Sequence, residues 1–460
     1  MVLGCTSSAG KSLLVTALAR WFYRQGVDVA PFKAQNMSNN ARVVEGGEIG
    51  VAQWLQSLAA GQVPSLNMNP VLVKPEADTR SQVVVNGHVR HYLTEMPWLD
   101  RGESLWSAMS TAFDDLHSQH ELIVIEGAGS PAEINLPDQV NNRTLLHADG
   151  VALLVVDIDR GGAFAHLYGT WSLVPESTRE RLAGYVLNKF RGDPSLLEPG
   201  STLLGDMTGL RLGGIVPMLH HGLPDEEGAI IRQPREGAEA VVGIVRYPYA
   251  SNLDEFHLVP RSAALHWITT PSDVDRCDLV ILPGSKHVAA DMAWLKGRGL
   301  DEVIVRRAAS GKTILGICGG AMMLGTHVAD VHAVEGATMG LGLLPLHTDF
   351  DPTKITEPVT VRFSEMTTPF DALTGIVAEG YEIRNGRVVG DGCALAPLVW
   401  GRGPVLATTA HGLLENSGVL QALFGRRADS SLEATFDFLA DVVDEHLDTE
   451  LLRELVGLYQ

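Results

Sequence analysis

Short, nearly continuous apolar runs alternate with helical patterns along this chain. In the first half the runs are MVLGCT, ELIVIEGAG, GVALLVVDID and LAGYVLNKF, and each ends in polar residues or glycine. Such a run is typical of a parallel strand that is covered on both faces. Strands that alternate with helices predict a doubly wound α/β sheet, and ligands of such sheets bind beyond the carboxyl ends of the strands.

The alternation is interrupted at residues 223–240, a charged, glycine-bearing stretch with proline near both ends. It restarts with VVGIVRYP, CDLVILPGSK, KTILGICGG and PVLATTAHG, and a helical tail closes the chain. We therefore expect a linker at 223–240 and two doubly wound α/β domains, residues 1–232 and 240–446.

The charge and composition of the chain exclude several kinds of partner. A net charge of -20 over 460 residues argues against nucleic acid or an anionic membrane surface, since both need basic patches. No signal peptide precedes Gly4, and no apolar run approaches the ~20 residues of a membrane span. Four widely spaced cysteines suggest a reducing compartment, so we expect a cytoplasmic protein. The sequence is compatible with a homo-oligomer.

The stretch GCTSSAGKS, residues 4–12, lies between a predicted strand and a predicted helix. This context favours a phosphate-binding loop over a simple glycine turn, because backbone amides and a helix N-terminus together bind anions. Gly10 belongs to this loop, Lys11 would reach the phosphates of ATP, and Ser12 would ligate Mg²⁺. The usual pattern has glycine where Cys5 stands, so here the glycine is displaced by one place.

Two polar residues follow other strands of this domain. Glu126 comes after ELIVI, where a carboxylate can hold the magnesium shell or orient a nucleophile. Asn188 follows a later strand and is a candidate for reading the adenine edge. Each has an ordinary structural alternative, such as a helix cap for Glu126.

In the second half, ILGICGGAMMLG places Cys318 between an apolar run and an apolar helical stretch. This is the strand–turn–helix pattern of a nucleophile elbow. The helix N-terminus stabilises a thiolate, and backbone N–H groups at Gly319 and at Gly284 and Ser285 can bind an oxyanion. His411, which again follows a strand, is the candidate base.

Core packing is the ordinary role of a buried cysteine, and we expect it for Cys5, Cys277 and Cys393. A nucleotide domain joined to a Cys–His acyl-transfer domain predicts glutamine-dependent amidation. Cys318 would form a thioester with glutamine and release ammonia, while ATP would convert a carboxylate into an acyl phosphate. Free ammonia is mostly protonated at neutral pH, which is a physical reason to enclose its transfer.

Many short stretches carry a resemblance that covers nearly the whole chain, among them TSSAGKS, FKAQNMSNN, MNPVLVKP, IEGAGSPAEINL, NKFRGDPSLLEPG, GICGG and HGL. The chain resembles the cobyric acid synthase family, glutamine-dependent amidases of cobalamin biosynthesis. FKAQNMSNN and MNPVLVKP distinguish it from the related cobyrinic acid a,c-diamide synthases. The N-terminal domain of the family is similar to dethiobiotin synthetase, which has the same displaced glycine.

The resemblance implies glutamine, ATP and a corrinoid, adenosylcobyrinic a,c-diamide, as substrates, with amidation at the b, d, e and g carboxylates. By analogy with dethiobiotin synthetase, Lys11 and Lys33 would contact phosphates and Asn188 would face adenine. The same analogy implies three groups around Mg²⁺: Ser12, Glu48 and Glu126.

The amide-rich stretch FKAQNMSNN follows a predicted buried strand. Amides both donate and accept hydrogen bonds, so a wall of them tolerates carboxylates and carboxamides alike. We expect Gln35, Asn36, Asn39 and Asn40 to form such a wall against the corrinoid. The alternative is that these side chains only tie down a loop.

The sequence leaves the third member of the glutaminase site open. Many glutaminases carry an acid two places after the histidine, where Leu413 stands here. We predict a dyad of Cys318 and His411, with Glu382 and Glu415 as unassigned candidates for the orienting group.

Two alternative functions also stay open. One is amidation of the other carboxylates of the ring, as in cobyrinic a,c-diamide synthesis. The other is a nucleotide-dependent binding or regulatory protein with a silent glutaminase domain, against which the intact Cys318, His411 and paired glycines argue.

Overall fold

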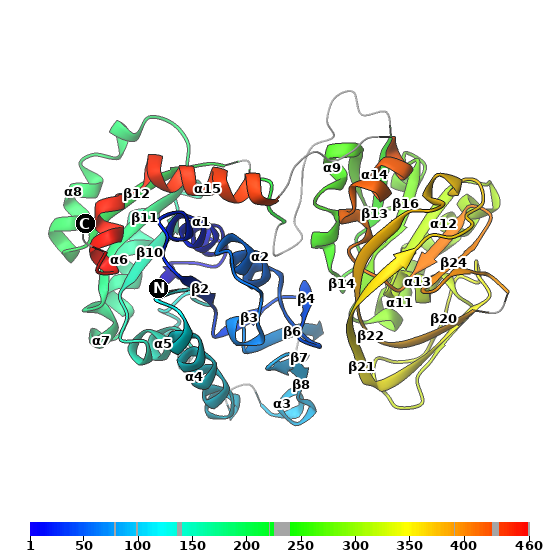
Figure 1. Cartoon of the computed structure of the whole chain (residues 1–460), viewed down its shortest axis with the longest axis horizontal. Helices are drawn as coiled ribbons and strands as arrows, with labels where there is room; N and C mark the ends of the chain where they lie inside the picture. The colour runs from blue at the N-terminus through cyan, green and yellow to red at the C-terminus, as the bar shows by residue number, and fades with distance from the viewer. Residues whose placement is uncertain are drawn as a thin grey trace.

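The computed structural model describes residues 1–77, 80–97, 100–135, 140–219, 221–224, 240–390, 392–425 and 432–458. Figure 1 shows two lobes side by side, with both ends of the chain in the N-terminal lobe. Most of the predicted linker, residues 225–239, lies outside the described residues. No helix within the described part of the chain is long and apolar enough to span a membrane.

The N-terminal lobe is built on a parallel sheet of order β1-β10-β11-β12. The pair β2-β9 extends it, because Val2 of β1 forms a parallel bridge with Glu126 directly after β9. The strands of this sheet are β1 (Val2–Gly4), β2 (Val29–Phe32), β9 (Leu122–Ile125), β10 (Ala152–Asp157), β11 (Leu182–Phe190) and β12 (Arg211–Pro217).

Strand β10 is covered on both faces. Leu153 and Val155 belong to one hydrophobic cluster, and Leu154 and Val156 belong to another. Successive side chains of a strand point to opposite faces, so each face of the sheet has its own core. The predicted doubly wound architecture is therefore confirmed for this lobe. Its helices are α1 (Lys11–Arg24), α2 (Val51–Ala59), α3 (His91–Glu95), α4 (Arg101–Gln119), α5 (Asn141–His147), α6 (Ala163–Leu173), α7 (Glu176–Arg179) and α8 (Gly200–Thr208), with 3₁₀ turns η1 (Leu66–Met68) and η3 (Pro194–Leu197).

Small strands lie on the side of the N-terminal lobe that faces the second lobe (Figure 1). They form a sheet of order β3-β6-β7-β8 and a hairpin of β4 and β5. Their bounds are β3 (Gln35–Met37), β4 (Ala41–Val44), β5 (Gly47–Gly50), β6 (Val71–Ala77), β7 (Arg80–Val85) and β8 (His88–Val89). The amide-rich stretch therefore runs from the main sheet toward the interface between the lobes.

The second lobe contains a seven-stranded sheet of order β15-β13-β16-β18-β25-β24-β23. Its first five strands are parallel, and β24 and β23 are antiparallel. The strands are β13 (Val241–Val245), β15 (Ala264–Ile268), β16 (Leu279–Leu282), β18 (Thr313–Ile317), β23 (Ala394–Ala396), β24 (Val399–Arg402) and β25 (Val405–Thr408). This arrangement confirms the predicted second α/β domain.

Two smaller sheets cover the ends of these strands: a pair β14-β17 and a sheet of order β20-β19-β21-β22. Their strands are β14 (Ala250–Ser251), β17 (Gly284–Ser285), β19 (His327–Ala329), β20 (Thr338–Met339), β21 (Leu346–Arg362) and β22 (Val377–Gly390). The helices of the lobe are α9 (Val259–Ser262), α10 (Pro271–Val274), α11 (Val288–Gly297), α12 (Leu300–Ala309), α13 (Gly319–Leu324) and α14 (Ser417–Phe424), with 3₁₀ turns η4 (Leu253–Phe256), η5 (Asp371–Leu373) and η6 (Leu413–Glu415).

The last two helices, α15 (Leu432–His446) and α16 (Thr449–Leu455), return to the N-terminal lobe (Figure 1). Trp21 Nε1 of α1 donates to Asp444 Oδ1 at 2.6 Å, and Arg20 pairs with Asp437 at 2.8 Å. The backbone of Asp448 joins β12 through the carbonyl of Gly213. The predicted second domain, residues 240–446, is thus wrong at its end, because the apolar face of α15 completes the core over α1.

We expect Leu439→Ala to lower the free energy of unfolding by about 2–5 kcal/mol, since Leu439 is fully buried against α1 and its truncation leaves a cavity. Denaturant unfolding followed by circular dichroism measures the change. Phe438→Ala is the matched control on the same helix, because that ring is 43% exposed. Equal losses in the two variants would contradict the docking of α15.

Candidate functional site

Cys318 stands at a sharp turn between β18 and α13. Its backbone has φ 49° and ψ −106°, a conformation that strains a non-glycine residue. A Cβ on Gly320 would lie 1.9 Å from the carbonyl oxygen of Leu282, so only glycine fits there. The predicted nucleophile elbow is therefore present in the backbone, and the glycines allow α13 to start directly behind the cysteine.

His411 follows β25, which is the neighbour of β18 in the sheet. Its imidazole is buried, with 1% of its side chain exposed, and it lies close enough to Cys318 for the charges of the two groups to interact. Parallel neighbouring strands bring their carboxyl ends to the same edge, which explains how residues so far apart in the chain meet. The structure thus brings the two predicted members of the dyad together.

Glu255 of η4 is the group that orients His411. Glu255 Oε1 lies 2.9 Å from His411 Nδ1, and Glu255 Oε2 accepts a hydrogen bond from the Gly412 amide at 2.9 Å. Burial alone would lower the pKa of His411, but the charges of Glu255 and Cys318 outweigh it and raise that pKa to about 10. A protonated imidazole beside the sulfur favours the thiolate, the reactive form of cysteine.

The two orienting candidates from the sequence have other partners. Glu382 pairs with Arg384 at 2.7 Å, and Glu415 pairs with Arg42. Sequence reasoning missed Glu255 because it stands 156 residues before His411. The available signal was weak: an acidic pair in SNLDEF shortly after the strand β13.

The predicted oxyanion groups gather around the same turn. A Cβ on Gly319 would lie 2.7 Å from the Ser285 amide nitrogen, and one on Gly284 would lie 2.8 Å from His411 Cε1. The β17 segment therefore passes close over the elbow. This places the backbone of Gly284, Ser285 and Gly319 beside Cys318, where amide donors can stabilise a tetrahedral oxyanion.

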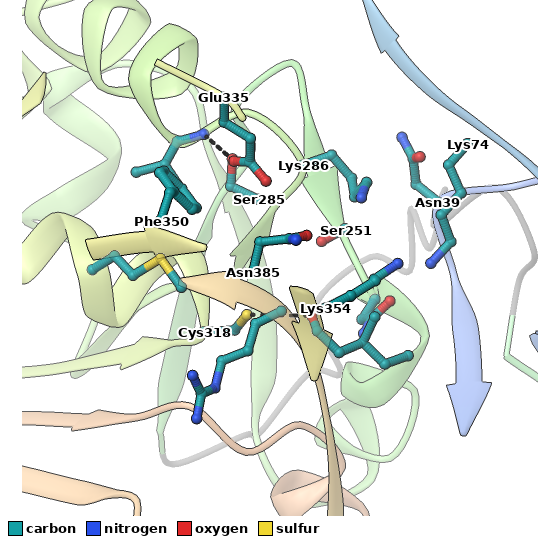
Figure 2. A pocket seen from close by; sticks show the side chains of 15 residues that line it. Asn39, Lys74, Ser251, Ser285, Lys286, Cys318, Glu335, Phe350, Lys354 and Asn385 are labelled. Atoms are coloured by element: carbon teal, nitrogen blue, oxygen red, sulfur yellow. Dashed lines mark hydrogen bonds between the residues drawn. The ribbon is translucent and has the colours of Figure 1, made fainter. Parts of the chain in front are cut away.

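A pocket opens at Cys318 on the interface between the two lobes. Figure 2 shows Asn39 and Lys74 of the N-terminal lobe on the side of this cavity opposite Cys318. Lys286 and Lys354 of the second lobe lie between them. The other lining residues are Ser251, Asn252, Ser285, Val288, Met322, Glu335, Phe350, Ile383, Arg384 and Asn385. The Cys318 side chain therefore lines a pocket that it shares with residues of the N-terminal lobe.

The three remaining cysteines are buried without the partners of Cys318. Burial raises the pKa of Cys5 and of Cys277 to about 11 each, so both remain thiols at neutral pH. Cys277 packs in the core of the second lobe, as does Cys393. These positions agree with the packing role expected for them.

The predicted phosphate loop lies between β1 and α1. Gly10 has φ 100°, and a Cβ there would lie 1.9 Å from Asn188 Nδ2, so the position requires glycine. Lys11 Nζ donates to the carbonyl of Gly129 at 3.0 Å, across the edge of the sheet. Asn188 of β11 donates to the carbonyl of Ala9 at 2.9 Å, and this hydrogen bond holds the loop.

Glu126 is the centre of a buried polar cluster at this edge. It accepts from Ser12 Oγ at 2.8 Å, from Lys33 Nζ at 2.7 Å and from Gln56 Nε2 at 2.6 Å. Burial alone would raise the pKa of Glu126, but Lys33 and these hydrogen bonds lower it, so the group is a carboxylate. A hydroxyl beside a carboxylate is a donor set that Mg²⁺ prefers, with phosphate and water completing its shell, so Ser12 and Glu126 fit this ion.

Glu48 has different partners from the other two predicted magnesium ligands. Its two oxygens pair with Lys74 of β6 and with Lys354 of the second lobe. Burial would raise the pKa of Glu48, but these two lysines lower it. In this structure the carboxylate serves an ion-pair network at the interface, while Ser12 and Glu126 meet at the phosphate loop.

The amide-rich stretch divides its side chains among several partners. Asn36 Nδ2 donates to Gln53 of α2 at 2.9 Å, and Asn40 Oδ1 accepts from the backbone of Leu253 in the second lobe at 3.1 Å. Asn39 instead lines the cavity at Cys318, while Gln35 is half-buried in β3. The bonds of Asn36 and Asn40 favour the alternative that these amides tie down a loop.

Comparisons with known proteins agree with this two-site arrangement. Residues 1–221 match the family model of the CobQ/CobB/MinD/ParA nucleotide-binding domain, and residues 241–419 match that of the CobB/CobQ-like glutamine amidotransferase domain. Among its relatives, cobyric acid synthase of Variovorax paradoxus is 50% identical over 99% of both chains. That of Leptothrix cholodnii is 48% identical over 99% of this chain and 96% of its own. This chain belongs to the cobyric acid synthase family of glutamine amidotransferases.

Proposed function

We propose that this protein is an ATP- and glutamine-dependent ligase that amidates the b, d, e and g carboxylates of adenosylcobyrinic a,c-diamide. The observation that carries the proposal is the position of the cavity at Cys318, which opens on the nucleotide-binding lobe. The relatives that match this chain over nearly their full length are cobyric acid synthases, and this supports the choice of acceptor. ATP use and four buried free cysteines fit a cytoplasmic enzyme.

The second lobe would release ammonia from glutamine. The Cys318 thiolate attacks the carboxamide carbon, and the His411 imidazolium gives its proton to the departing nitrogen, which leaves as ammonia. Water then attacks the thioester while His411 takes a proton from it, and the thiolate departs to leave glutamate. Glu255 holds the imidazole with Nδ1 toward itself, so that Nε2 serves the sulfur.

The N-terminal lobe would activate the acceptor. A corrinoid carboxylate oxygen attacks the γ-phosphorus of ATP, ADP leaves, and ammonia then displaces phosphate from the acyl phosphate to form the amide. Lys11 and Lys33, whose amines lie at the edge of the sheet beside Gly129 and Glu126, would bind the phosphates, and the backbone of Gly10 would belong to the loop around them. Mg²⁺ held by Ser12 and Glu126 would neutralise phosphate charge.

The interface would keep ammonia from becoming ammonium. Ammonia is released into a cavity whose far wall carries Asn39 and Lys74 of the nucleotide-binding lobe. Asn39 Oδ1 is buried and has no hydrogen-bond partner among the described residues, so it can accept a hydrogen bond from an N–H group of ammonia. Its position in the pocket at Cys318 supports a role for Asn39 with the nitrogen, in place of the expected wall against the corrinoid with Gln35 and Asn36.

The direct test is the product formed from a defined corrinoid. We expect the protein with glutamine and ATP to add amide groups to the a,c-diamide, each visible in mass spectra as the replacement of OH by NH₂. Cobyrinic acid, in which the a and c positions are still carboxylates, is the control acceptor. Amidation of cobyrinic acid at those two positions alone would contradict the proposal and assign the a,c-diamide reaction instead.

Cys318→Ala is expected to reduce glutamine-dependent amidation by about 10⁴-fold or more, because it removes the nucleophile. Amidation supported by ammonium salts should persist, since ammonia from solution bypasses the second lobe. Cys277→Ala, a change of the same kind in the core, is the matched control and should leave glutamate release unchanged. If Cys318→Ala still released glutamate, Cys318 would not be the nucleophile.

Glu255→Gln should move the alkaline limit of glutamate release to lower pH. In the wild type the imidazolium is present below the His411 pKa of about 10 and is lost as the pH rises through that value. Without the carboxylate, burial lowers the pKa of His411, so the imidazolium, which gives its proton to the departing nitrogen, is lost at a lower pH. The rate at neutral pH should fall by up to about 10⁴-fold, as when the carboxylate that orients a triad histidine is replaced by its amide.

The pH profile of kcat for glutamate release measures this shift. Glu379→Gln, on β22 but hydrogen-bonded to Thr360, is the matched control and should keep the wild-type profile. A Glu255→Gln profile that overlays the wild type would mean that Glu255 does not set the charge of His411.

A further inference from the structure

Arg42 of β4 reaches from the nucleotide-binding lobe into the second lobe. Its side chain is 5% exposed, and its guanidinium pairs with both Asp254 and Glu415. The same guanidinium lies over two aromatic rings, that of Trp54 at 5.1 Å and that of Tyr381 at 5.0 Å. Both carboxylates contact the same nitrogen, Nη2, so it is the stacking of the planar guanidinium on the two rings that a lysine cannot reproduce.

The acidic partners of Arg42 belong to segments that hold His411. Asp254 precedes Glu255 in η4, and Glu255 binds His411 Nδ1. Asn40, two residues before Arg42, accepts from the Leu253 amide at the start of the same turn. The turn that carries the orienting carboxylate is therefore held at its first two residues by the nucleotide-binding lobe.

The other contacts of Arg42 lead to His411 as well. Tyr381 stacks on the His411 ring at a centroid distance of 5.5 Å, and their backbones exchange two hydrogen bonds of 2.9 and 3.1 Å. Glu415 ends η6, which begins two residues after His411. Arg42 thus contacts three segments that surround the His411 imidazole. Its ion pairs and ring contacts among the described residues include neither His411 nor Cys318.

Helix α2 links the same arginine to the phosphate loop. Trp54 of α2 lies against the Arg42 guanidinium, and the adjacent Gln53 and nearby Gln56 both donate to Glu126. Glu126 in turn accepts from Ser12 of the phosphate loop. One short segment, residues 40–56, therefore contacts both sites.

We propose that Arg42 is a positioning residue of the glutaminase site, supplied by the nucleotide-binding lobe, and that it couples glutamine hydrolysis to nucleotide binding. Arg42 holds η4 so that Glu255 keeps the imidazole of His411 in place. Helix α2 transmits changes around Glu126 to Arg42. The inference rests on the proposed function, because it assigns a role in glutamine hydrolysis. It adds a residue of the opposite lobe to a site that the sequence places wholly in residues 240–446.

Arg42→Gln is expected to lower kcat for glutamate release by about 10–100-fold and to leave KM for glutamine nearly unchanged. Amidation supported by ammonium salts should stay within about twofold of the wild type, which also shows that the variant is folded. ATP should change the rate of glutamate release in the wild type and have no effect in Arg42→Gln. Arg42→Lys, which keeps the charge but not the planar group that stacks on Trp54 and Tyr381, should recover only part of kcat.

Arg24→Gln is the matched control. Arg24 also forms an ion pair with an aspartate, Asp441, but between α1 and α15 and away from the interface. Its removal should leave glutamate release, the response to ATP and amidation unchanged.

A double-mutant cycle with Glu255→Gln separates positioning from a merely structural role. If Arg42 acts through Glu255, adding Arg42→Gln to Glu255→Gln should change kcat by less than about twofold. Additive losses would overturn the proposal, and so would equal losses of glutamine- and ammonium-supported amidation, or a wild-type rate that does not respond to ATP. Glutamate release needs no corrinoid, so this test remains valid even if the a,c-diamide is not the acceptor.

Discussion

Buried ion pairs between the two lobes determine how the two sites face each other. Arg42 pairs with Asp254, and Lys354 pairs with Glu48, each across the interface. An ion removed from water without a partner costs several kcal/mol, so these charges are tolerated only while the lobes stay in register. Because such pairs need close geometry, they select one relative orientation of the lobes. That orientation makes the cavity at Cys318 open toward the nucleotide-binding lobe.

The same rule of topology operates twice in this chain. In each lobe the candidate site residues follow the carboxyl ends of parallel strands: Ser12 and Glu126 near β1 and β9, Cys318 and His411 after β18 and β25. A doubly wound sheet leaves its helices on the faces and this edge open, so polar residues gather there. At the interface, this edge of the second lobe lies beside the small strands of the N-terminal lobe (Figure 1).

Local features of the sequence were sufficient for much of the site. The glycines around Cys318 predict the elbow because only they fit under Leu282 and Ser285. The phosphate loop is predicted by AGKS between a strand and a helix, and Gly10 indeed has a left-handed backbone. In contrast, the expected magnesium ligand Glu48 binds two lysines, because the second lobe supplies one of them, Lys354.

The sequence by itself determined many of the parallel strands, the two loops and the candidates for nucleophile and base, since periodicity and backbone sterics act over a few residues. Only the tertiary structure decided that Glu255 orients a histidine 156 residues away, that Arg42 enters the second lobe, and that α15 returns to cover α1. These choices depend on which buried charges and apolar faces remain unmatched once each domain has formed. No short-range pattern encodes such a match, because its two halves lie 156 or more residues apart in these examples and become neighbours only on folding.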